Sequence, residues 1–264
     1  MDYFRGYRSF RSDPEWTSKM FVGVALLLCG AVIPILPGVA LQGWAALVIR
    51  RSAHGIDTPL PRLDFDFDYL GKLLDPGFKG FIVRLLWTFP ASMLLSVFVM
   101  CGYFGFMLSV AGGVQAGGDA GAVAALCCFG AGMLMMFPLY IVLLMPAGVA
   151  AMRCELTNNL NEGMKFGEVI AMTRMMFREL FIGGLLIGLV QTVLAMCSLL
   201  LCYIPLPFVL WLGVYVHACF QADIYKAYLA KGGAPLALAP PDLPLPVPPQ
   251  PPQQLPPQQA AGGW

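Results

Sequence analysis

Three long stretches of the chain carry almost no charge. No charged residue occurs in the ranges 20–49 and 180–222, and Asp119 is the only one in 85–152. A helix needs about 20 apolar residues to cross a hydrocarbon core of roughly 30 Å. The ranges 85–152 and 180–222 are each long enough for two crossings. The pattern therefore predicts an all-α helical bundle embedded in a membrane.

Proline, glycine and acidic residues divide these stretches into about six predicted helices. Asp13-Pro14 and Asp75-Pro76 each place an N-cap acid before a proline suited to the first turn of a helix. A glycine-rich turn over 111–121 and a tight turn over 204–207 separate the members of the later pairs. The predicted helices run from 14 to about 34–38, from 39 to 51, from 76 to 110, from 123 to 153, from 180 to 203 and from 208 to 230.

The positive charges predict which ends of the helices face the cytoplasm. Four of the 16 Lys and Arg precede the first apolar stretch, six lie in 50–84, four in 153–178 and two beyond position 222. The turns over 111–121 and 204–207 carry none, and positively charged short loops stay cytoplasmic. This distribution predicts three helical hairpins with both termini in the cytoplasm.

The first hairpin has three interpretations. Its second arm has about 14 residues and would measure roughly 21 Å at 1.5 Å per residue, less than a full span. Two true crossings and a re-entrant hairpin both keep the basic segments on one side of the membrane. A single long tilted helix would instead leave the four N-terminal positive residues outside.

Two connections on the cytoplasmic side have the pattern of short amphipathic helices. Their apolar residues recur on one helical face, and charged residues lie on the other. The apolar faces comprise Leu70, Leu73, Leu74 and Phe78 in the first connection, and Phe166, Val169, Ile170 and Phe177 in the second. Both segments fit a helix that lies at the membrane surface, and equally a cap that packs on the ends of the hairpins.

The C-terminal segment differs from the rest in composition. From Gly232 onward it holds 11 of the 22 prolines together with many glutamines. Such a composition cannot bury a core and favours extended polyproline II structure. The sequence therefore predicts an N-terminal cytoplasmic segment over 1–13, a membrane domain over 14–231, and a disordered cytoplasmic tail over 232–264. The tail fits a solubilising tether or a ligand for a cytoplasmic protein.

Composition excludes several classes of protein. Of 264 residues, 58% are hydrophobic and 12% charged, the net charge is +1 and the mean hydropathy is +0.73. A soluble domain carries about 25% charged residues, so the chain as a whole is neither a soluble enzyme nor a nucleic-acid-binding protein. The eight cysteines lie in or beside apolar stretches, as small packing residues do.

Motifs that carry chemistry are scarce. Asp64, Asp66 and Asp68 alternate with aromatic residues, but this run lacks the glycine and the late glutamate of a calcium-binding loop. Nucleotide-binding and hydrolase motifs are missing from the sequence. We therefore expect no enzymatic activity, no cofactor and no metal.

The last predicted helix carries a polar strip. His217, Gln221 and Tyr225 follow one another at intervals of four and share nearly one face. Polar residues inside a membrane are costly and usually point into the bundle. The strip could line a substrate path or proton relay, or could make an interhelical hydrogen bond. Gly184 and Gly188 form a GxxxG motif, which predicts close packing of helices.

Three segments resemble one known family. They are PGVALQGWAALVIRRSAHGIDTPLPRLD, then DPGFKGF, and LLCYIPLPFVLWLGVYVHACFQADIYKAY. Together they resemble the bacterial and archaeal membrane family called domain of unknown function 4013, over roughly residues 14–230. The positions that correspond to the family pattern are Gly43-Trp44, Arg50, Leu60-Pro61, Gly77, Lys79, His217, Gln221 and Tyr225. The resemblance implies a multi-pass protein of the bacterial inner membrane and no known activity.

Two functions fit the sequence. The first is a membrane-organising or protein-interaction component, whose partners are the lipid bilayer and a cytoplasmic protein bound through 232–264. The alternative is a small transporter or channel subunit built around the strip at His217. A homo-oligomer fits either function, and we expect no nucleic-acid partner.

Overall fold

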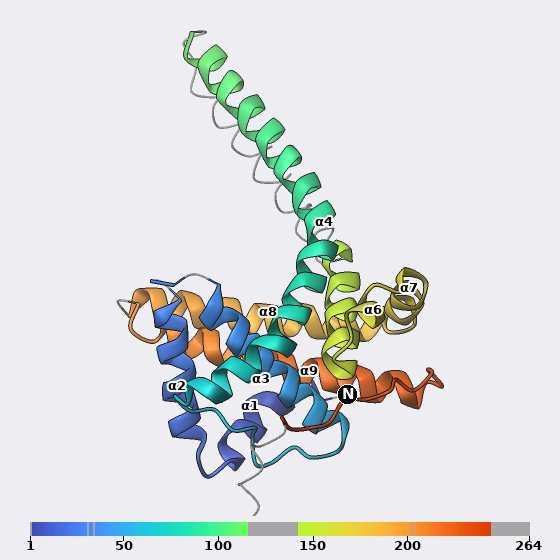
Figure 1. The fold of residues 1–264 in the computed structure, drawn as a ribbon. Coiled ribbons are helices and arrows are strands. Elements are labelled where there is room, and N and C mark those ends of the chain that lie inside the picture. The colour runs from blue at the N-terminus through green and yellow to red at the C-terminus, as the bar shows by residue number, and fades with distance from the viewer. Residues whose placement is uncertain (1, 31, 34, 116–141, 202, 244–264) are drawn as a thin grey trace, which may run out of the picture.

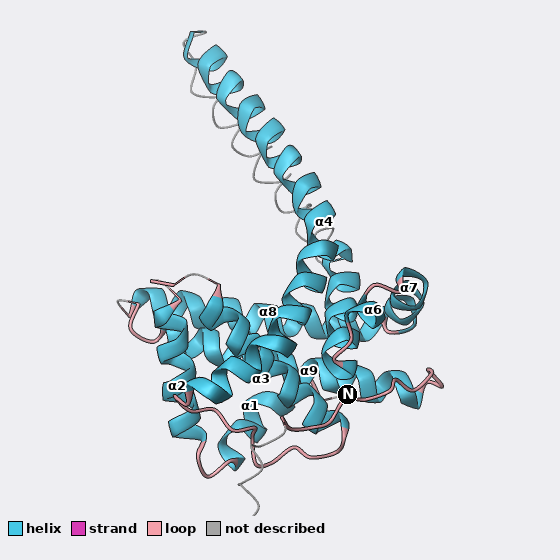
Figure 2. Cartoon of the chain, viewed as in Figure 1, coloured by secondary structure: helices cyan, strands magenta, loops and turns pink. Residues whose placement is uncertain are grey.

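The computed structural model describes the chain except for residues 1, 31, 34, 116–141, 202 and 244–264. The described residues form helices, turns and extended segments, and none of them lies in a β-strand (Figure 2). This confirms the predicted all-α class. The elements are α1 Arg5–Ser9, the 3-10 helix η1 Phe10–Ser12, α2 Trp16–Cys29, α3 Leu36–Ala53, α4 Phe67–Gln115, a helical segment over 142–157, α6 Leu160–Gly163, α7 Phe166–Met175, α8 Phe177–Leu200 and α9 Leu206–Ala230.

Three helices are long and apolar enough to cross a membrane. They comprise Phe67–Phe104 within α4, all of α8 and all of α9, among the residues that the structure describes. The sequence predicted the last two as helices over 180–203 and 208–230. Most of the predicted glycine-rich turn over 111–121 and of the helix over 123–153 lies outside the described residues, so the three-hairpin topology stays a prediction.

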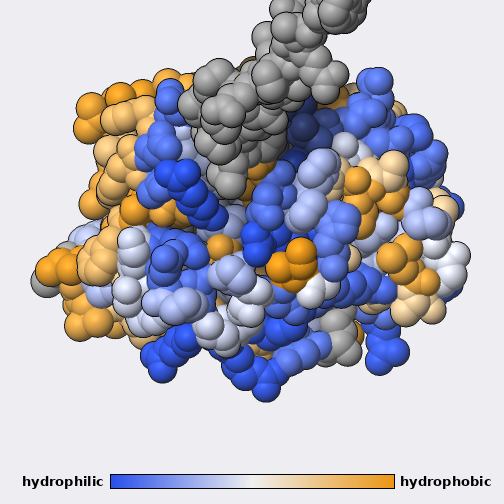
Figure 3. Space-filling view, turned by 60° about the horizontal axis from the view of Figure 1, so that its bottom comes forward, coloured by the Kyte–Doolittle hydropathy of each residue, from blue (hydrophilic) through white to orange (hydrophobic). Residues whose placement is uncertain are grey.

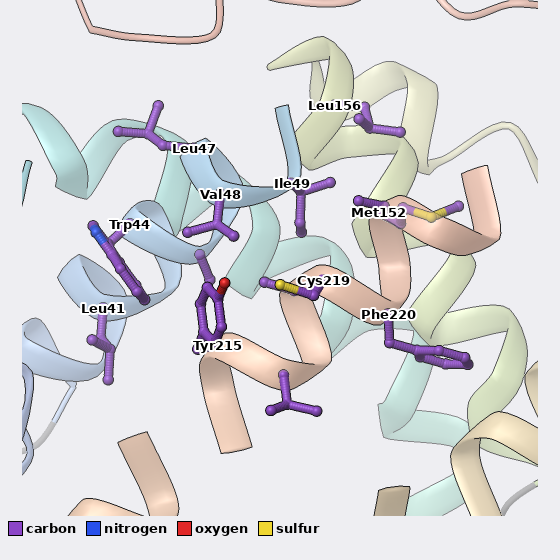
Figure 4. Packing of buried hydrophobic residues seen from close by; sticks show 14 of the residues in the cluster. Leu41, Trp44, Leu47, Val48, Ile49, Met152, Leu156, Tyr215, Cys219 and Phe220 are labelled. Carbon is purple, nitrogen blue, oxygen red and sulfur yellow. The ribbon is translucent and has the colours of Figure 1, made fainter. Parts of the chain in front are cut away.

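The core lies where α3 and α9 cross. α3 is buried along most of its length and packs against α4, α9 and α2. The rings of Trp44 and Trp211 stack with their centroids 5.7 Å apart, and Phe10 meets Trp211 edge-on at 5.1 Å. Figure 4 shows Trp44 on α3 and Tyr215 on α9 in this cluster. Gly43 lets α4 approach α3 closely and Trp44 stacks on α9, which explains why the short second arm of the predicted first hairpin is a core helix.

Asp13 holds the start of α2 in place. The sequence predicted it as an N-cap for a helix starting at Pro14, whereas α2 begins at Trp16. The Asp13 carboxylate accepts hydrogen bonds from Lys19 Nζ at 3.0 Å, from Glu15 N at 2.7 Å and from Leu60 N. Its residue is 1% exposed, so this buried carboxylate joins α2 to the loop before α4.

α4 is one helix of 49 residues with Pro76 and Pro90 inside it. The sequence predicted a separate surface helix and then a new helix starting at Asp75-Pro76. Packing against α3 explains the continuity, because the two backbones touch where Gly43 faces Gly77. A Cβ on Gly43 would lie 1.9 Å from Leu73 O, which no side chain can tolerate. Figure 1 shows α4 leaving this crossing, changing direction and projecting away from the rest of the described chain.

The residues of the two predicted apolar faces differ in their burial in the structure. Leu73 and Val169 are fully buried, and Phe78, Phe166 and Phe177 are exposed. The remaining three members, Leu70, Leu74 and Ile170, are half-buried. Residues 69–79 are thus the first turns of α4 and not an independent helix, because the glycine contact draws them onto α3. The burial of Leu73 and Val169 favours packing on the bundle over a position at the membrane surface.

The first part of the predicted disordered tail is an extended segment that packs against the bundle. Within 232–243, Leu236 N donates to Tyr225 Oη at 3.1 Å, and Ala239 N donates to Leu156 O at 2.8 Å. Composition suggested disorder from Gly232, but these tertiary hydrogen bonds replace the partners that a solvated chain finds in water. The rest of the predicted tail, 244–264, lies outside the described residues.

Polar and apolar surfaces are segregated. Figure 3 shows hydrophilic residues over most of one face, with hydrophobic residues gathered along its left side. In Figure 1 that side holds α2 and the turn between α8 and α9. Exposed apolar side chains on α8 and α4 include Leu185, Leu189, Val193, Met93 and Leu94. Such large exposed apolar areas are typical of surfaces that contact lipid or another protein.

Candidate functional site

A cavity of about 540 Å³ lies among α2, α3, α4, α8, α9 and the helical segment 142–157. Its size is in the range of small-molecule pockets. The lining is largely apolar, and six polar side chains reach it. These are Gln42, Arg84, Glu155, Gln191, His217 and Gln221.

Glu155 is the most buried charged group at the cavity. Its residue is 2% exposed, and its Oε1 accepts a hydrogen bond from Gln42 Nε2 at 2.9 Å. Arg84 donates to the same oxygen from 3.5 Å. Arg50 Nε donates to the backbone oxygen of Glu155 at 2.6 Å. Side chains from two helices, α3 and α4, thus donate to this one carboxylate.

Burial determines the electrostatics of this carboxylate. Burial raises the pKa of Glu155, because a carboxylate loses its hydration in the interior. The charge of Arg84, the hydrogen bond from Gln42 and the charge of Arg50 oppose that shift without cancelling it. A glutamate in these surroundings can exchange a proton closer to neutral pH than one in water.

Chain topology brings Glu155 to Arg84. Arg84 is the last charged residue before the stretch 85–152, and Glu155 is the second charged residue after it. α4 leaves the bundle beyond Arg84 and the segment 142–157 returns, so the two flanks of the stretch meet (Figure 1). The sequence analysis missed both residues and Gln42. Charges that flank one long apolar stretch were the available signal, because the predicted hairpin would bring the two ends of that stretch together.

The predicted polar strip is only partly assembled at the cavity. His217 and Gln221 both line it, and the Gln221 amide donates to His217 Nε2 at 3.1 Å. Tyr225 lies elsewhere: its hydroxyl accepts from Leu236 N in the extended C-terminal segment. The interhelical hydrogen bond expected of His217 is therefore an intrahelical one among the described residues.

A second cavity of about 180 Å³ adjoins the first, between the segment 142–157, α8 and α9. Four residues line both cavities: Gly184, His217, Phe220 and Gln221. The hydrogen-bonded pair of His217 and Gln221 consequently lies at the partition between two internal spaces.

Two glycines on α8 border the larger cavity, and their lack of side chains leaves part of its volume open. The GxxxG motif of Gly184 and Gly188 predicted close helix packing, and this is wrong. A Cβ added to either residue meets no described atom within 4 Å, and both residues line the cavity. Close contacts occur at other glycines, such as Gly23, where a Cβ would lie 1.9 Å from Trp211 Nε1.

Metal binding finds no support among the described residues. They contain no group of three or more His, Cys, Asp or Glu side chains that could hold an ion. In the aspartate run, Arg62 pairs with Asp64 at 2.6 Å and with Asp66 at 3.0 Å. These carboxylates therefore neutralise a neighbouring arginine.

Comparison with known proteins identifies the family. The profile described as "Protein of unknown function (DUF4013)" matches residues 26–219, which include most of the residues that line the larger cavity. No curated protein and no solved structure matches the chain. The matched range covers most of the chain, so the protein belongs to the DUF4013 family of proteins of unknown function.

Proposed function

We propose that the chain is a multi-pass membrane protein that binds a small solute in the cavity of about 540 Å³ and passes it through the bundle, as a small transporter or channel subunit. The cavity itself carries this proposal. Ionisable groups inside membrane bundles commonly mark paths for substrates, ions or protons. Glu155, Arg84 and His217 all meet at this one space.

Three observations favour solute binding over a purely structural role. The cavity is built from six helical elements, and its polar groups converge from five of them. Gly184 and Gly188 leave open space where larger residues would pack without a clash. The second cavity extends the space beyond the His217–Gln221 pair. A structural hydrogen bond needs no such volume on both sides.

A filled cavity tests the proposal. Gly188→Leu should occupy the cavity without steric clash, and Gly71→Leu is the matched control on an exposed turn of α4 with equally open surroundings. The full chain is reconstituted in liposomes with radiolabelled carboxylates, amines and neutral solutes of up to about ten carbons. We expect uptake by the wild type and by Gly71→Leu, and at least a tenfold loss in Gly188→Leu. Equal uptake by all three proteins contradicts the proposal.

A variant at His217 tests the role of this residue in the same uptake assay. If the His217–Gln221 pair controls passage between the cavities, His217→Ala should change uptake at an unchanged melting temperature. A lower melting temperature with unchanged uptake assigns the residue a structural role. The wild type and Gly71→Leu are measured beside it.

A membrane-organising or protein-interaction role is the second candidate. Exposed aromatic rings favour it: Phe177 and Phe181 stack with centroids 6.1 Å apart, and Phe166 is 60% exposed. Affinity capture with the full chain and with a chain ending at 243 tests a cytoplasmic partner of the tail. Truncation at 243 spares the segment 232–243, which is hydrogen-bonded to the bundle. Loss of one specific partner on truncation supports this role, and identical captured proteins contradict it.

The location and orientation are part of the proposal. We propose the bacterial inner membrane, with both termini in the cytoplasm and with homo-oligomers allowed. Single cysteines introduced into a cysteine-free chain report orientation through a membrane-impermeant label. A cysteine at Pro205 should react in intact cells, and cysteines at Ser12 and Glu162 only after permeabilisation. Labelling at Ser12 in intact cells contradicts the three-hairpin topology.

A further inference from the structure

Arg84 has donor capacity to spare. Its side chain is 37% exposed and borders the cavity, and its one described ion pair is a single contact with Glu155 Oε1 at 3.5 Å. A guanidinium group has five N–H donors arranged to bind a carboxylate or phosphate through two of them. Most of these donors are therefore free to bind an anion that enters the cavity.

Glu155 is also incompletely bonded. Both described side-chain hydrogen bonds reach Oε1, and no described residue donates to Oε2. The side chain is 1% exposed and borders the cavity, so bulk water has little access to the carboxylate. A carboxylate that is buried to this extent is stabilised when it binds a proton, because the neutral acid costs less to bury.

The charges around Glu155 leave Arg84 as its main counter-ion. On α3, the guanidinium of Arg50 is engaged with the backbone oxygen of Glu155. On α4, Lys79 pairs with Asp75 at 2.7 Å.

The other titratable neighbours lie on the helical segment itself and on α9. Cys154 precedes Glu155 on the segment, and His217 faces the same cavity from α9. Arg153 is bound to Glu162 and Glu168. If another anion takes Arg84, Arg50 is the described cation that remains near the carboxylate, and its described hydrogen bond reaches the backbone oxygen of Glu155 and not the side chain.

We propose that the cavity binds a small amphipathic anion whose charged group pairs with Arg84, and that Glu155 takes up one proton as the anion binds. This proposal rests on the proposed function and names its substrate class. Before binding, Arg84 and Glu155 carry opposite charges that sum to zero. After binding, the anion balances Arg84 and the protonated Glu155 is neutral, so the sum stays zero. The proton comes from water, and no covalent bond to carbon changes.

The remaining lining defines the rest of the ligand. Apolar side chains from four helices border the cavity away from the Arg84–Glu155 pair: Leu27, Leu41, Ile187, Leu210 and Val214. They favour an alkyl or aryl group, and the volume of about 540 Å³ accommodates a short chain. A medium-chain carboxylate has both the charge and the apolar length that the cavity requires.

Matched eight-carbon probes test the inference. The full chain in lipid nanodiscs is titrated with radiolabelled octanoate, octylammonium and octanol at pH 6 and pH 8, and binding to empty nanodiscs is subtracted. We expect octanoate to bind at least fivefold more tightly at pH 6 than at pH 8, since one bound proton changes affinity by up to about tenfold per pH unit. Octylammonium and octanol should bind more weakly and without this pH dependence.

Two variants separate the roles of the pair. Glu155→Gln imitates the protonated acid, so it should bind octanoate at pH 8 as tightly as the wild type does at pH 6, with no pH dependence. Arg84→Gln should lose at least tenfold in octanoate affinity at both pH values. If Arg84→Gln does not fold, the pH profile of Glu155→Gln decides the question alone.

The failures are distinguishable. Preferential binding of octylammonium or octanol, or equal octanoate affinity at pH 6 and pH 8 in the wild type, overturns the anion–proton inference and leaves solute binding intact. Unchanged pH dependence in Glu155→Gln also overturns it. If none of the three probes shows binding that Gly188→Leu prevents, both this inference and the proposed function fail.

Discussion

α8 and α9 are neighbouring helices of similar length that occupy opposite environments. α8 has 24 residues, of which Gly183, Ile187 and Ser198 are buried. α9 has 25 residues and buries eleven, including Trp211, Tyr215 and Gln221. Both are long and apolar enough to span a membrane, and they pack against each other. α8 nevertheless lies at the outside of the bundle and α9 at its centre.

The difference shows that apolar character does not mark the core of this protein. α8 is the more uniformly apolar helix and presents Leu189 and Val193 outward, as a helix facing lipid does. α9 mixes aromatic, small and polar residues, and its polar groups would be costly in lipid. Aromatic and polar content therefore identifies the inner helix, and uninterrupted aliphatic content the outer one.

Truncation of the largest inner side chain should have the largest effect. Trp211→Ala removes a fully buried ring that stacks on Trp44, and we expect a loss of about 3–5 kcal/mol in unfolding free energy. Leu189→Ala on α8, where the side chain is 61% exposed, should change it by less than about 0.5 kcal/mol. Denaturant unfolding in one detergent measures both. Similar losses would contradict the assignment of inner and outer helices.

The contribution of Asp13 to the stability of the fold should depend on pH. Burial alone would raise the pKa of Asp13, but hydrogen bonds from Lys19, Leu60 and Glu15 lower it below the ordinary 3.8. The stabilisation is present above the ordinary pKa and is lost as the pH falls through the lower folded value. Asp13→Ala leaves the buried Lys19 with only Leu60 O and the exposed Glu15 as partners, which should cost up to about 3 kcal/mol.

The melting temperatures of the wild type and Asp13→Ala, measured from pH 7 to pH 3, test this prediction. We expect a constant gap from pH 7 to pH 5 and a narrowing gap below pH 4. A gap that widens in acid would show that folding raises the pKa of Asp13, contrary to this prediction.

Replacing one glycine of α8 and one of α9 with alanine should change the free energy of unfolding in opposite directions. A Cβ on Gly213 of α9 would lie 2.1 Å from Gln191 Nε2, which donates to Val209 O at 2.6 Å. Gly213→Ala should break the bonds of Gln191 and cost about 1–3 kcal/mol. Gly188→Ala faces open space on α8 and should gain about 0.5–1 kcal/mol from helix propensity. Thermal unfolding of both variants measures these changes. A loss of stability in both variants would show that α8 is packed at the cavity.

The smallest effect is expected at the surface contact between the two helices. Lys231, just beyond α9, donates to Glu179 Oε1 of α8 at 2.8 Å and to Met175 O at 3.1 Å. Both charged side chains are partly exposed, so Lys231→Ala should cost only about 0.2–1 kcal/mol. The loss should shrink further in 1 M salt, where charges are screened over a few ångströms. A loss that is independent of salt would assign the effect to packing of the lysine stem.

Local sequence patterns predicted the positions of the helices more reliably than they predicted which helices pack together. The apolar stretches and the proline turn fixed α8 and α9 to within a few residues, and the all-α class is confirmed. The prediction of a helix beginning at Asp75-Pro76 was wrong because α3 supports α4 across the proline. The GxxxG prediction was wrong because spacing cannot tell a packed glycine from one that borders a cavity.

The sequence predicted about six helices in three hairpins, and the described residues contain three helices that are long and apolar enough to span a membrane. The sequence by itself determined that the chain is helical and largely apolar and that its family is DUF4013. These properties depend on composition and on contacts within a few residues. Only the tertiary structure decided that Glu155, Arg84 and Gln42 share one cavity, since 71 and 113 positions separate Glu155 from its two partners. It also decided that α9 is the inner helix. Burial and charge pairing depend on which distant surfaces meet, and the spacing of residues along one helix does not specify that.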